Sequence, residues 1–504
     1  MRSFLVTTIV LTVALPALAL QTTDINPVNR RAVDGSTPLQ WAVYENDVNE
    51  VLRLLQAGAN VSLANNYGAT PMGLAAEVGN AEIIKLLLEA GADADSPNAD
   101  GQTALMAVAR TGNVDAAELL VKHGARVDAR ERWGGQTALM WASARRHPEM
   151  MQFLISKGAD VNARSIDRDY QRHVTAEGRP KNLDSGGLTP LLYAARENCL
   201  ACVDVLVRNG ADLNLPDPDG VTPLLLAIMN VNWDLAKKLI EAGADVNQWD
   251  MFGEAPLFTA VGLRNQVSGG HASIDPLNET KGITIVRMLL EHGANPNMQL
   301  FFRPANLRGS TNTRGSTPLI RAATNGDLEV VKLLLQNGAN VNLMMADRQT
   351  ALMAVLAGRA PEPQALEIIA VLHEAGADLN VIALINHREE SRGGTALHYA
   401  VRKRYKEAIK KLAEYGIDMN ARDQDGLTAL DYTQSRGFMA FMAVQTPLYK
   451  EEAALLRQLG ATEEFKRKIE WPVLGPPQGI DVDIWPIGEP VVHDPVYTHA
   501  PTSN

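Results

Sequence analysis

Cys199 and Cys202 are the two residues of this chain whose type and spacing come closest to a chemical site. They are its only cysteines, and they stand as Cys-x-x-Cys in the segment ENCLACVDVLV. At the start of a helix such a pair can act as a redox-active dithiol, and in an oxidising compartment it can close a small disulfide. The βαβ pattern that accompanies thioredoxin-like pairs is missing. A disulfide or two ordinary thiols is therefore favoured over redox catalysis.

Other catalytic and metal-binding patterns are absent from the sequence. It contains no G-x-S-x-G, no H-E-x-x-H, no phosphate-binding loop and no haem-attachment motif, and it lacks the four cysteines of a zinc site. His493 and His499, with Asp494 beside them, form a weak metal pattern and are read as solvated residues. The sequence thus predicts no catalytic residue, no metal and no cofactor, and it leaves open a site assembled between loops.

Most of the chain consists of copies of one segment. One copy, DGQTALMAVARTGNVDAAELLVKHGARV, starts at Asp100, and its glycine recurs every 33 residues as Gly35, Gly68 and Gly101. Allowing for insertions, about eleven units lie between residues 34 and 462. A fixed period of this length is typical of repeat architectures, in which each unit contacts its neighbours.

Each unit carries the signals of two short helices. A Thr-Pro pair such as Thr70-Pro71 starts the first helix, because the hydroxyl accepts a free backbone N–H and proline loses nothing at the first helical position. A polar break such as Gly79-Asn80 turns the chain, and an amphipathic second helix follows. That helix ends at a glycine, the residue for which a left-handed conformation costs least; these glycines are Gly58, Gly91, Gly124, Gly158, Gly210, Gly243, Gly293, Gly338, Gly376, Gly416 and Gly460.

These residues resemble the ankyrin-repeat pattern, D-x-x-G-x-T-P-L-H-x-A followed by G-A-D-V-N, across residues 34–462. The resemblance implies an all-α solenoid of about eleven helix-turn-helix units, with β-hairpin fingers and a concave binding face. Repeat seven departs from the pattern, because its segment GEAPLF lacks the threonine cap. The layout of long spacers is similar to that of exported bacterial ankyrin-repeat proteins.

Four insertions interrupt the array, at residues 165–186, 263–282, 298–314 and 384–392. Three of them lengthen fingers, and insertions on one edge often mark the binding side. Tolerated drift in loop length is the alternative, since surface loops accept extra residues at small cost. The third insertion is the strongest candidate for partner binding, because it combines aromatic and cationic residues: Phe301, Phe302, Arg303 and Arg308.

Two further groups of aromatic residues are candidates. Tyr67, Trp133, Trp249 and Phe252 fall at fingertip turns, where an exposed ring is a plausible hot spot, with packing against a neighbouring finger as the alternative. The second group shares one position of the first helix and is more typical of packing than of a ligand platform; it comprises Trp41, Trp141, Tyr193, Tyr399 and Tyr432.

The net charge and the N-terminal residues limit which partners and which compartment we expect. The net charge of −11 argues against general binding to nucleic acid. Arg2, an apolar run over residues 4–15 and Ala17-Leu18-Ala19 are typical of a signal peptide, with cleavage after Ala19. A membrane anchor is the alternative, but the run is short for a membrane span. The sequence predicts a periplasmic or secreted protein without stable membrane insertion after cleavage.

The remaining segments complete the expected organisation. Residues 20–33 form a linker, and the acidic, proline-rich residues 463–504 form an extended tail that either lies along the array or binds a partner. We expect a non-enzymatic scaffold for an unidentified protein partner. The competing expectation is a redox or enzyme-accessory protein that uses Cys199 and Cys202 or a pocket between loops, and a purely structural role in the envelope is a third.

Overall fold

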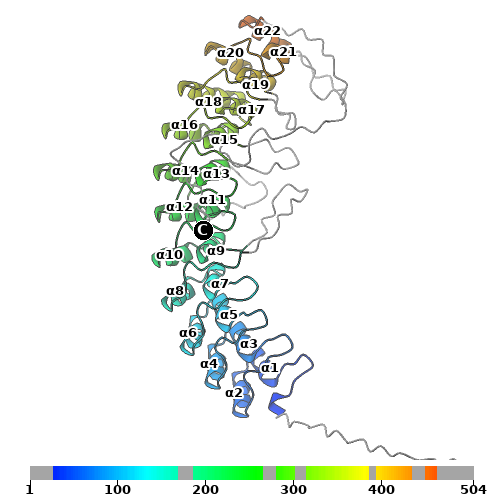
Figure 1. The fold of residues 1–504 in the computed structure, drawn as a ribbon, viewed down its shortest axis with the longest axis vertical. Helices are drawn as coiled ribbons and strands as arrows, with labels where there is room; N and C mark the ends of the chain where they lie inside the picture. The colour runs from blue at the N-terminus through cyan, green and yellow to red at the C-terminus, as the bar shows by residue number, and fades with distance from the viewer. Residues whose placement is uncertain are drawn as a thin grey trace, which may run out of the picture. The chain divides into compact units, whose positions relative to one another are not determined.

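The structure is a computed structural model that describes residues 27–167, 186–264, 280–300, 314–384, 393–433 and 449–462. The chain forms two compact units, Met1–Ala129 and Arg130–Asn504. In both, the described residues form helices joined by turns (Figure 1). We describe each unit by itself.

The first unit holds three helix pairs, preceded by the short 3-10 helix η1 (Pro27–Asn29). In each pair the odd-numbered member is the first helix of a repeat and the even-numbered member is the second. The helices are α1 (Pro38–Tyr44), α2 (Val48–Gln56), α3 (Pro71–Val78), α4 (Ala81–Glu89), α5 (Ala104–Thr111) and α6 (Val114–Lys122).

The second unit continues the same alternation over the described residues through eight further pairs. Its helices are α7 (Ala138–Ala144), α8 (Pro148–Ser156), α9 (Pro190–Arg196), α10 (Leu200–Arg208), α11 (Pro223–Met229), α12 (Trp233–Glu241), α13 (Pro256–Leu263), α14 (Gly282–Glu291), α15 (Pro318–Asn325), α16 (Leu328–Gln336), α17 (Ala351–Ala357), α18 (Glu362–Glu374), α19 (Ala396–Lys403), α20 (Lys406–Glu414), α21 (Ala429–Tyr432) and α22 (Lys450–Gln458). The predicted number of about eleven repeats is therefore confirmed.

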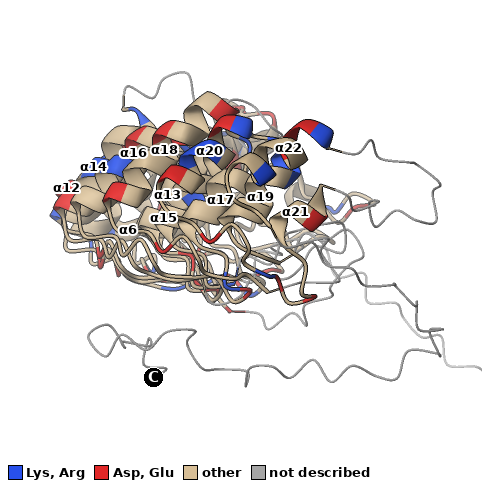
Figure 2. Cartoon of the chain, turned by 90° about the horizontal axis from the view of Figure 1, so that it is seen from above, with Lys and Arg blue, Asp and Glu red and all other residues tan. Residues whose placement is uncertain are grey.

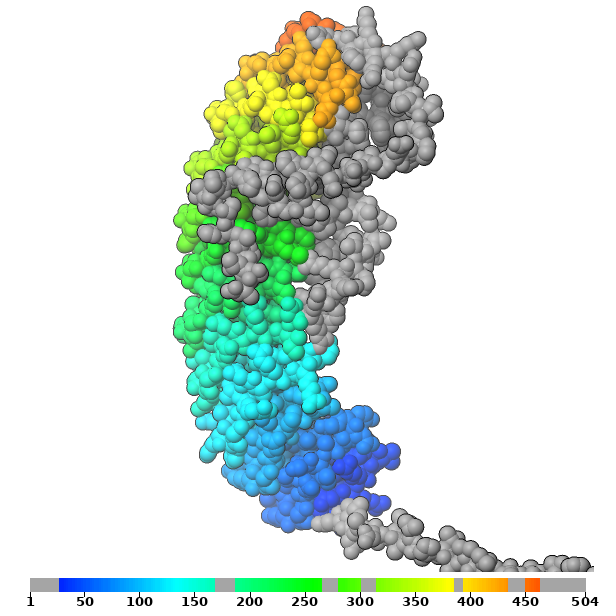
Figure 3. All heavy atoms as spheres, in the orientation of Figure 1, coloured from blue at the N-terminus to red at the C-terminus, as the bar shows by residue number. Residues whose placement is uncertain are grey.

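Each unit is built from two layers of helices. First helices pack on the first helices of neighbouring repeats, as α3 does on α1 and α5, and second helices pack on second helices, as α12 does on α10 and α14. Figure 3 shows successive repeats of each unit stacked in chain order. The core between the layers consists of fully buried aliphatic side chains, of which Leu105 and Leu120 are examples. Because one repeat cannot cover its own apolar side, this stacking holds each unit together.

The predicted threonine caps are present at the first helices. Their hydroxyl oxygens accept the backbone N–H three residues further on, at Thr37, Thr70, Thr103, Thr137, Thr189, Thr222, Thr317, Thr350 and Thr428. In repeat seven, Ala255 occupies the cap position of α13 and makes no side-chain hydrogen bond. The loss of this cap, expected from GEAPLF, falls in the same repeat that the second insertion splits between Leu263 and Gly282.

The fingers, which we define as the residues between the second helix of one repeat and the first helix of the next, differ in detail from the expected β-hairpins. In the finger before α3, Asn65 Oδ1 accepts the N–H groups of Tyr67 and Ala69 at 3.0 and 2.9 Å, and Gly68 adopts a φ of 77°. A side-chain oxygen thus takes the place of a strand partner. In the described residues the fingers are therefore tight turns without a β-ladder, and the β-bridges there are isolated, as at Ala383 and Gly394.

A row of asparagine side chains links successive repeats of the second unit. Asn297 is typical, because its Oδ1 accepts the N–H of Asn340 at 2.7 Å and its Nδ2 donates to the carbonyl of Gly338 at 3.1 Å. The same Oδ1 contact is made by Asn162, Asn214, Asn247, Asn342, Asn380 and Asn420. These contacts explain why so many units end in asparagine: its amide can accept from and donate to the next repeat at once.

Asp250, the turn residue of the finger before α13, gives one repeat a pH dependence. It is 4% exposed, and burial raises the pKa of its carboxyl from 3.8 to about 6. An acid whose pKa is higher in the folded chain stabilises the fold when protonated. We expect its contribution to be complete below about pH 4 and lost as the pH rises through 6, a fall of about 3 kcal/mol over the whole range.

Urea unfolding of the wild type and of Asp250→Asn at pH 4.5 and pH 7.5 tests this expectation. Asparagine is a matched replacement, since Asn65 and Asn98 hold equivalent turns with the same Oδ1 contacts. The variant should lose less stability than the wild type over this interval. Equal losses in both proteins would contradict the assignment.

Candidate partner-binding surfaces

Tyr67 and Trp133 are the fingertip aromatics that the structure places in solvent, at 76% and 72% exposed. The turns that carry them are ordered by buried or half-buried acceptors. Trp133 follows Glu131, which is 4% exposed and whose carboxylate accepts the N–H groups of Trp133, Gly134 and Gln136 at 2.5–3.0 Å. A ring held outward on a fixed backbone loses little entropy when a partner covers it.

Trp249 and Phe252, the other two fingertip candidates, are partly buried. The N–H of Phe252 donates to Asp250 Oδ1 at 2.9 Å, so its backbone belongs to the Asp250 turn. The four predicted fingertip residues therefore divide into two exposed rings and two half-covered ones. All four had the same weight in the sequence, because all fall at finger turns and the sequence does not show what covers each ring.

The predicted residues of the third insertion, Phe301, Phe302, Arg303 and Arg308, lie outside the described residues. The structure does describe how this finger is closed at its base. Leu300 is buried, its N–H donates to Ser316 at 3.0 Å, and the N–H of Gly315 donates back to Leu300 at 2.7 Å. The partner-binding role of this insertion stays a prediction.

The aromatic position of the first helices is not uniform along the chain. Tyr193, Tyr399 and Tyr432 are 4–5% exposed and therefore pack in the second unit, and the hydroxyl of Tyr432 donates to Asp423 at 2.6 Å. Trp41, in contrast, is 47% exposed. The packing interpretation thus describes the tyrosines and not Trp41.

Sequence reasoning missed a cleft beside Trp41. Tyr44, one turn further along α1, is 65% exposed, and its ring meets that of Trp41 edge to face at a centroid distance of 6.0 Å. A cavity of about 220 Å³ lies next to this pair and is lined by Asp34, Ser36, Gln40, Trp41, Tyr44, Asn65 and Leu74. The spacing of three residues between Trp41 and Tyr44, which places both rings on one helix face, was the available signal.

The second helices of the second unit carry many charged residues, and others lie on its fingers (Figure 2). Both signs are mixed there, as in α20 with Lys406, Glu407, Lys410, Lys411 and Glu414. An open groove of about 830 Å³ on this layer follows the same pattern, since its lining combines Lys237, Lys238 and Lys281 with Asp234 and Glu241. A surface of alternating charge is typical of a solvated helix face.

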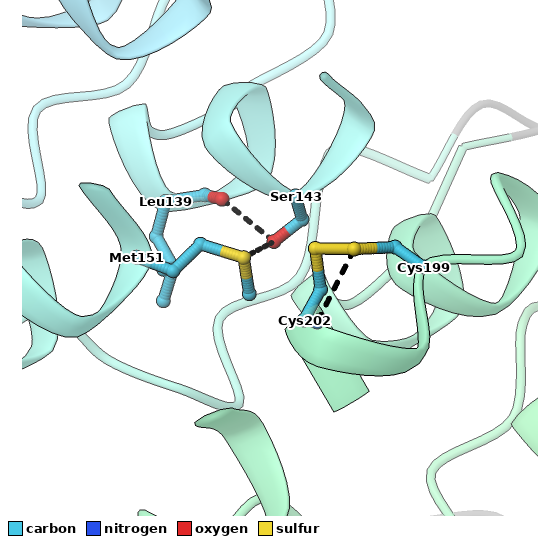
Figure 4. Close-up of a disulfide and its surroundings, with 5 residues drawn as sticks. All are labelled: Leu139, Ser143, Met151, Cys199 and Cys202. Carbon is cyan, nitrogen blue, oxygen red and sulfur yellow. Dashed lines mark hydrogen bonds between the residues drawn. A yellow bond between two sulfur atoms is a disulfide. The ribbon is translucent and has the colours of Figure 1, made fainter. Parts of the chain in front are cut away.

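Cys199 and Cys202 are joined by a disulfide at the start of α10 (Figure 4). Cys199 is the N-cap residue, and its sulfur accepts the N–H of Cys202 at 3.2 Å. The two residues are 4% and 0% exposed, and Ser143 and Met151 of the preceding repeat lie beside them. The bond occupies the place where other repeats use Asn or Asp as a cap, as Asn80 does for α4.

Removal of this disulfide should cost stability locally. A bond that closes so short a loop contributes about 2 kcal/mol by limiting the unfolded chain. We expect the Cys199→Ser/Cys202→Ala double variant to lose about this much, because serine keeps the cap. Urea unfolding under oxidising and reducing conditions measures this loss. The double variant is the control, because its stability should not change when reductant is added, whereas the stability of the wild type should fall. A wild type that is insensitive to complete reduction would contradict the expectation.

Two other kinds of site have no counterpart in the described residues. No helix there combines the length and apolar composition that a bilayer crossing requires. No cluster of three or more His, Cys, Asp or Glu side chains is arranged there to hold a metal ion.

Comparison with known proteins identifies the repeat. The family model described as ankyrin repeats (3 copies) matches residues 13–98, 75–165, 172–250, 281–383, 346–423 and 367–438, more than half of the chain. No curated protein matches the chain. Among solved structures, the ankyrin repeat domain of Bcl-3, a unique member of the IkappaB protein family, is 28% identical, with a TM-score of 0.38, and the alignment covers 45% of this chain and 94% of that one.

The human ASB11 ankyrin repeat domain is 20% identical, with a TM-score of 0.40, and the alignment covers 52% of this chain and all of that one. The family match is the finding that decides the assignment, because it extends over most of the repeats described above. Ankyrin-repeat proteins are usually non-enzymatic scaffolds that bind other proteins. This chain belongs to the ankyrin-repeat family.

Proposed function

We propose that this protein is a non-enzymatic scaffold that acts outside the cytoplasm and binds a protein partner through its fingers and the exposed face of its first helices. The observation that carries the proposal is the pair of fingertip rings, Tyr67 and Trp133, exposed to 76% and 72% on turns whose backbones are fixed by hydrogen bonds. Large aromatic side chains are the residues that most often dominate binding at protein interfaces.

The location outside the cytoplasm rests on the N-terminal sequence and on the cysteines. Arg2, the apolar residues 4–15 and the small residues up to Ala19 fit a cleaved signal peptide, and this segment lies outside the described residues. A disulfide between Cys199 and Cys202 supports the same proposal, because such bonds persist in oxidising compartments. The net charge of −11 disfavours nucleic acid as the partner.

The alternative, a redox or enzyme-accessory protein, has less support. A catalytic dithiol must be reached by its substrate, whereas Cys199 and Cys202 are 4% and 0% exposed. Titration of the thiols after reduction distinguishes the two. A redox protein requires a thiol whose pKa lies far below the ordinary value of about 8.5.

Crosslinking in the native compartment, followed by mass spectrometry, identifies the partner. With that partner in hand, we expect Trp133→Ala to weaken binding at least about 10-fold, because truncation of an aromatic hot spot costs about 2 kcal/mol or more. Circular dichroism and thermal unfolding should be unchanged, since the ring is in solvent.

Leu52→Ala is the matched control. Leu52 is an exposed apolar residue, 41% exposed, on the second-helix layer at α2 and away from the fingers. It should bind like the wild type. The proposal fails if no protein is crosslinked, and its finger surface fails if Trp133→Ala and Leu52→Ala bind the partner equally well.

A further inference from the structure

We propose that the first unit carries a socket for a cationic side chain, an arginine or lysine of the protein partner, in the cleft beside α1. The Trp41 socket is defined by its lining residues Asp34, Ser36, Gln40, Trp41, Tyr44, Asn65 and Leu74. The inference rests on the proposed scaffold function and adds the chemistry of the group that is recognised.

The chain itself provides the precedent for a cation at this position. In α9, the guanidinium carbon of Arg196 lies 5.0 Å from the ring centre of Tyr193, and in α19 Arg402 lies 4.1 Å from that of Tyr399. In both helices the arginine stands three residues after the aromatic residue. Attraction between a cation and the face of an aromatic ring accounts for this pairing.

Helix α1 has the ring without the arginine. Trp41 occupies the position of Tyr193 and Tyr399, but the residue three positions later is Tyr44. Within the described part of the chain, no Lys or Arg side chain is placed over the Trp41 ring, which is 47% exposed. Tryptophan is also the aromatic residue that attracts cations most strongly. The first repeat therefore presents a ring of the kind that binds arginine elsewhere in this protein, and leaves its face to a partner.

Asp34 supplies the charge that a cation needs at the other end of the socket. Its carboxylate accepts the N–H and the hydroxyl of Ser36 at 3.0 and 2.7 Å, and these hydrogen bonds lower its pKa, so that it is ionised at neutral pH. A carboxylate has about four acceptor positions, so Ser36 leaves capacity for a guanidinium or ammonium group.

Gln40 is another polar lining group, and its hydrogen bonds are already made within the fold. Gln40 accepts from the N–H of Thr37 at 2.8 Å and donates to the carbonyl of Ala69 at 2.6 Å, and it is 1% exposed. It therefore forms a wall of the socket, and Asp34 is the group that decides the charge of the occupant. The electrostatic potential around the socket is negative, as the Asp34 carboxylate is, because residues 27–129 contain thirteen Asp and Glu and seven Lys and Arg.

An uncharged apolar or proline-rich segment is the competing occupant, and binding of peptide probes separates the two. The probes are fluorescent 11-residue Gly/Ser peptides that carry three arginines, three lysines, three citrullines or three leucines. Citrulline keeps the shape of arginine and removes its charge. With the full chain, measured by anisotropy, we expect the arginine and lysine peptides to bind at least about 10-fold more tightly than the citrulline and leucine peptides, and to weaken as salt is added.

Variants assign this binding to the socket. Trp41→Ala and Asp34→Asn should each weaken the arginine peptide at least about 10-fold, and Trp41→Phe should retain most of the binding because it keeps a ring. One matched control should bind like the wild type: Asp47→Asn removes an exposed acid of the same unit and keeps the cap of α2. Thermal unfolding monitors the fold, and Trp41→Phe and Asp34→Asn decide the result if Trp41→Ala does not fold.

The outcomes separate this inference from the scaffold proposal. Equal binding of the citrulline and arginine peptides, or an Asp34→Asn variant that binds the arginine peptide like the wild type, overturns the socket. If a crosslinked native partner is weakened by Trp133→Ala but not by Trp41→Ala or Asp34→Asn, the scaffold stands and the socket falls. If the arginine peptide binds through Trp41 and Asp34 but no protein is ever crosslinked, the socket stands and the scaffold falls.

Discussion

Replacing Gly186 by alanine is expected to destabilise the base of the first insertion by about 3 kcal/mol or more. Gly186 has a φ of 83°, and a β-carbon built there would collide with the backbone carbonyl oxygen of Ile166. The atom in the way belongs to the backbone, so no side-chain rotation can relieve the clash. The variant must open the contacts that close the two ends of the insertion, among them the bond from Ser165 N–H to the carbonyl of Leu188 at 3.0 Å.

Gly210→Ala is the matched control for this prediction. Gly210 has a nearly equal φ of 79°, but no heavy atom lies within 4 Å of its added β-carbon. It should therefore show the left-handed strain alone, about 1 kcal/mol. Hydrogen exchange at the amides of Ser165 and Leu188 measures the local effect, and we expect about 100-fold faster exchange in Gly186→Ala. If the two substitutions had similar effects, the backbone at Ile166 would move away from the added β-carbon at little energetic cost.

The periodic parts of the fold were predictable because each depends on residues close in sequence. A threonine three residues before a free N–H, as at Thr70 and Gly73, forms a cap whatever the neighbouring repeats do. A glycine after the second helix, such as Gly91 with a φ of 85°, satisfies a local backbone requirement. The helix pairs and their stacking follow from these signals and the apolar stripes.

The exposure of individual rings was harder to predict because it depends on which side chains cover each ring. Trp41 and Tyr399 occupy the same helix position, yet one is 47% exposed and the other 4%. The difference lies in their surroundings, since Tyr399 is covered by Arg402 while Trp41 is followed by Tyr44. Position within a repeat gives the direction of a side chain, and its neighbours decide its burial.

The fingers show a second limit of prediction from the sequence. Their turn glycines and Asn or Asp residues were visible in the sequence, but whether two short arms would pair as strands was not. The structure answers this at Asn65, whose Oδ1 takes the N–H groups of Tyr67 and Ala69. Capture of backbone groups by a side chain competes with β-pairing.

Replacing Arg264 by alanine is expected to be the other strongly destabilising change, and its cause was invisible in the sequence. Arg264 follows α13 and is 11% exposed in its side chain; its Nε lies 2.8 Å from Asp327 Oδ2, and Asp327 is 4% exposed. The pair joins repeat seven to repeat eight across 63 positions of the chain, so no local sequence pattern predicts it. Removal of one member of a buried pair leaves the other charge buried without compensation, which lowers the free energy of unfolding by about 3–5 kcal/mol.

A second substitution tests this explanation within the same site. Asp327 caps α16 through the N–H of Val330, and Asn80 and Asn113 cap α4 and α6 in the same way. In the Arg264→Ala background, Asp327→Asn should therefore restore at least about 1 kcal/mol, because it removes the stranded charge and keeps the cap.

The exposed pair of Arg53 and Glu50 is the comparison, with side chains 63% and 38% exposed and a separation of 2.6 Å. Arg53→Ala should cost at most about 0.5 kcal/mol, because water screens the pair and replaces its contacts. Urea unfolding followed by far-UV circular dichroism measures all four proteins. If Arg264→Ala costs no more than Arg53→Ala, the Asp327 carboxylate is solvated when its partner is absent, and repeats seven and eight are held together by their apolar contacts and the Asn297 hydrogen bonds.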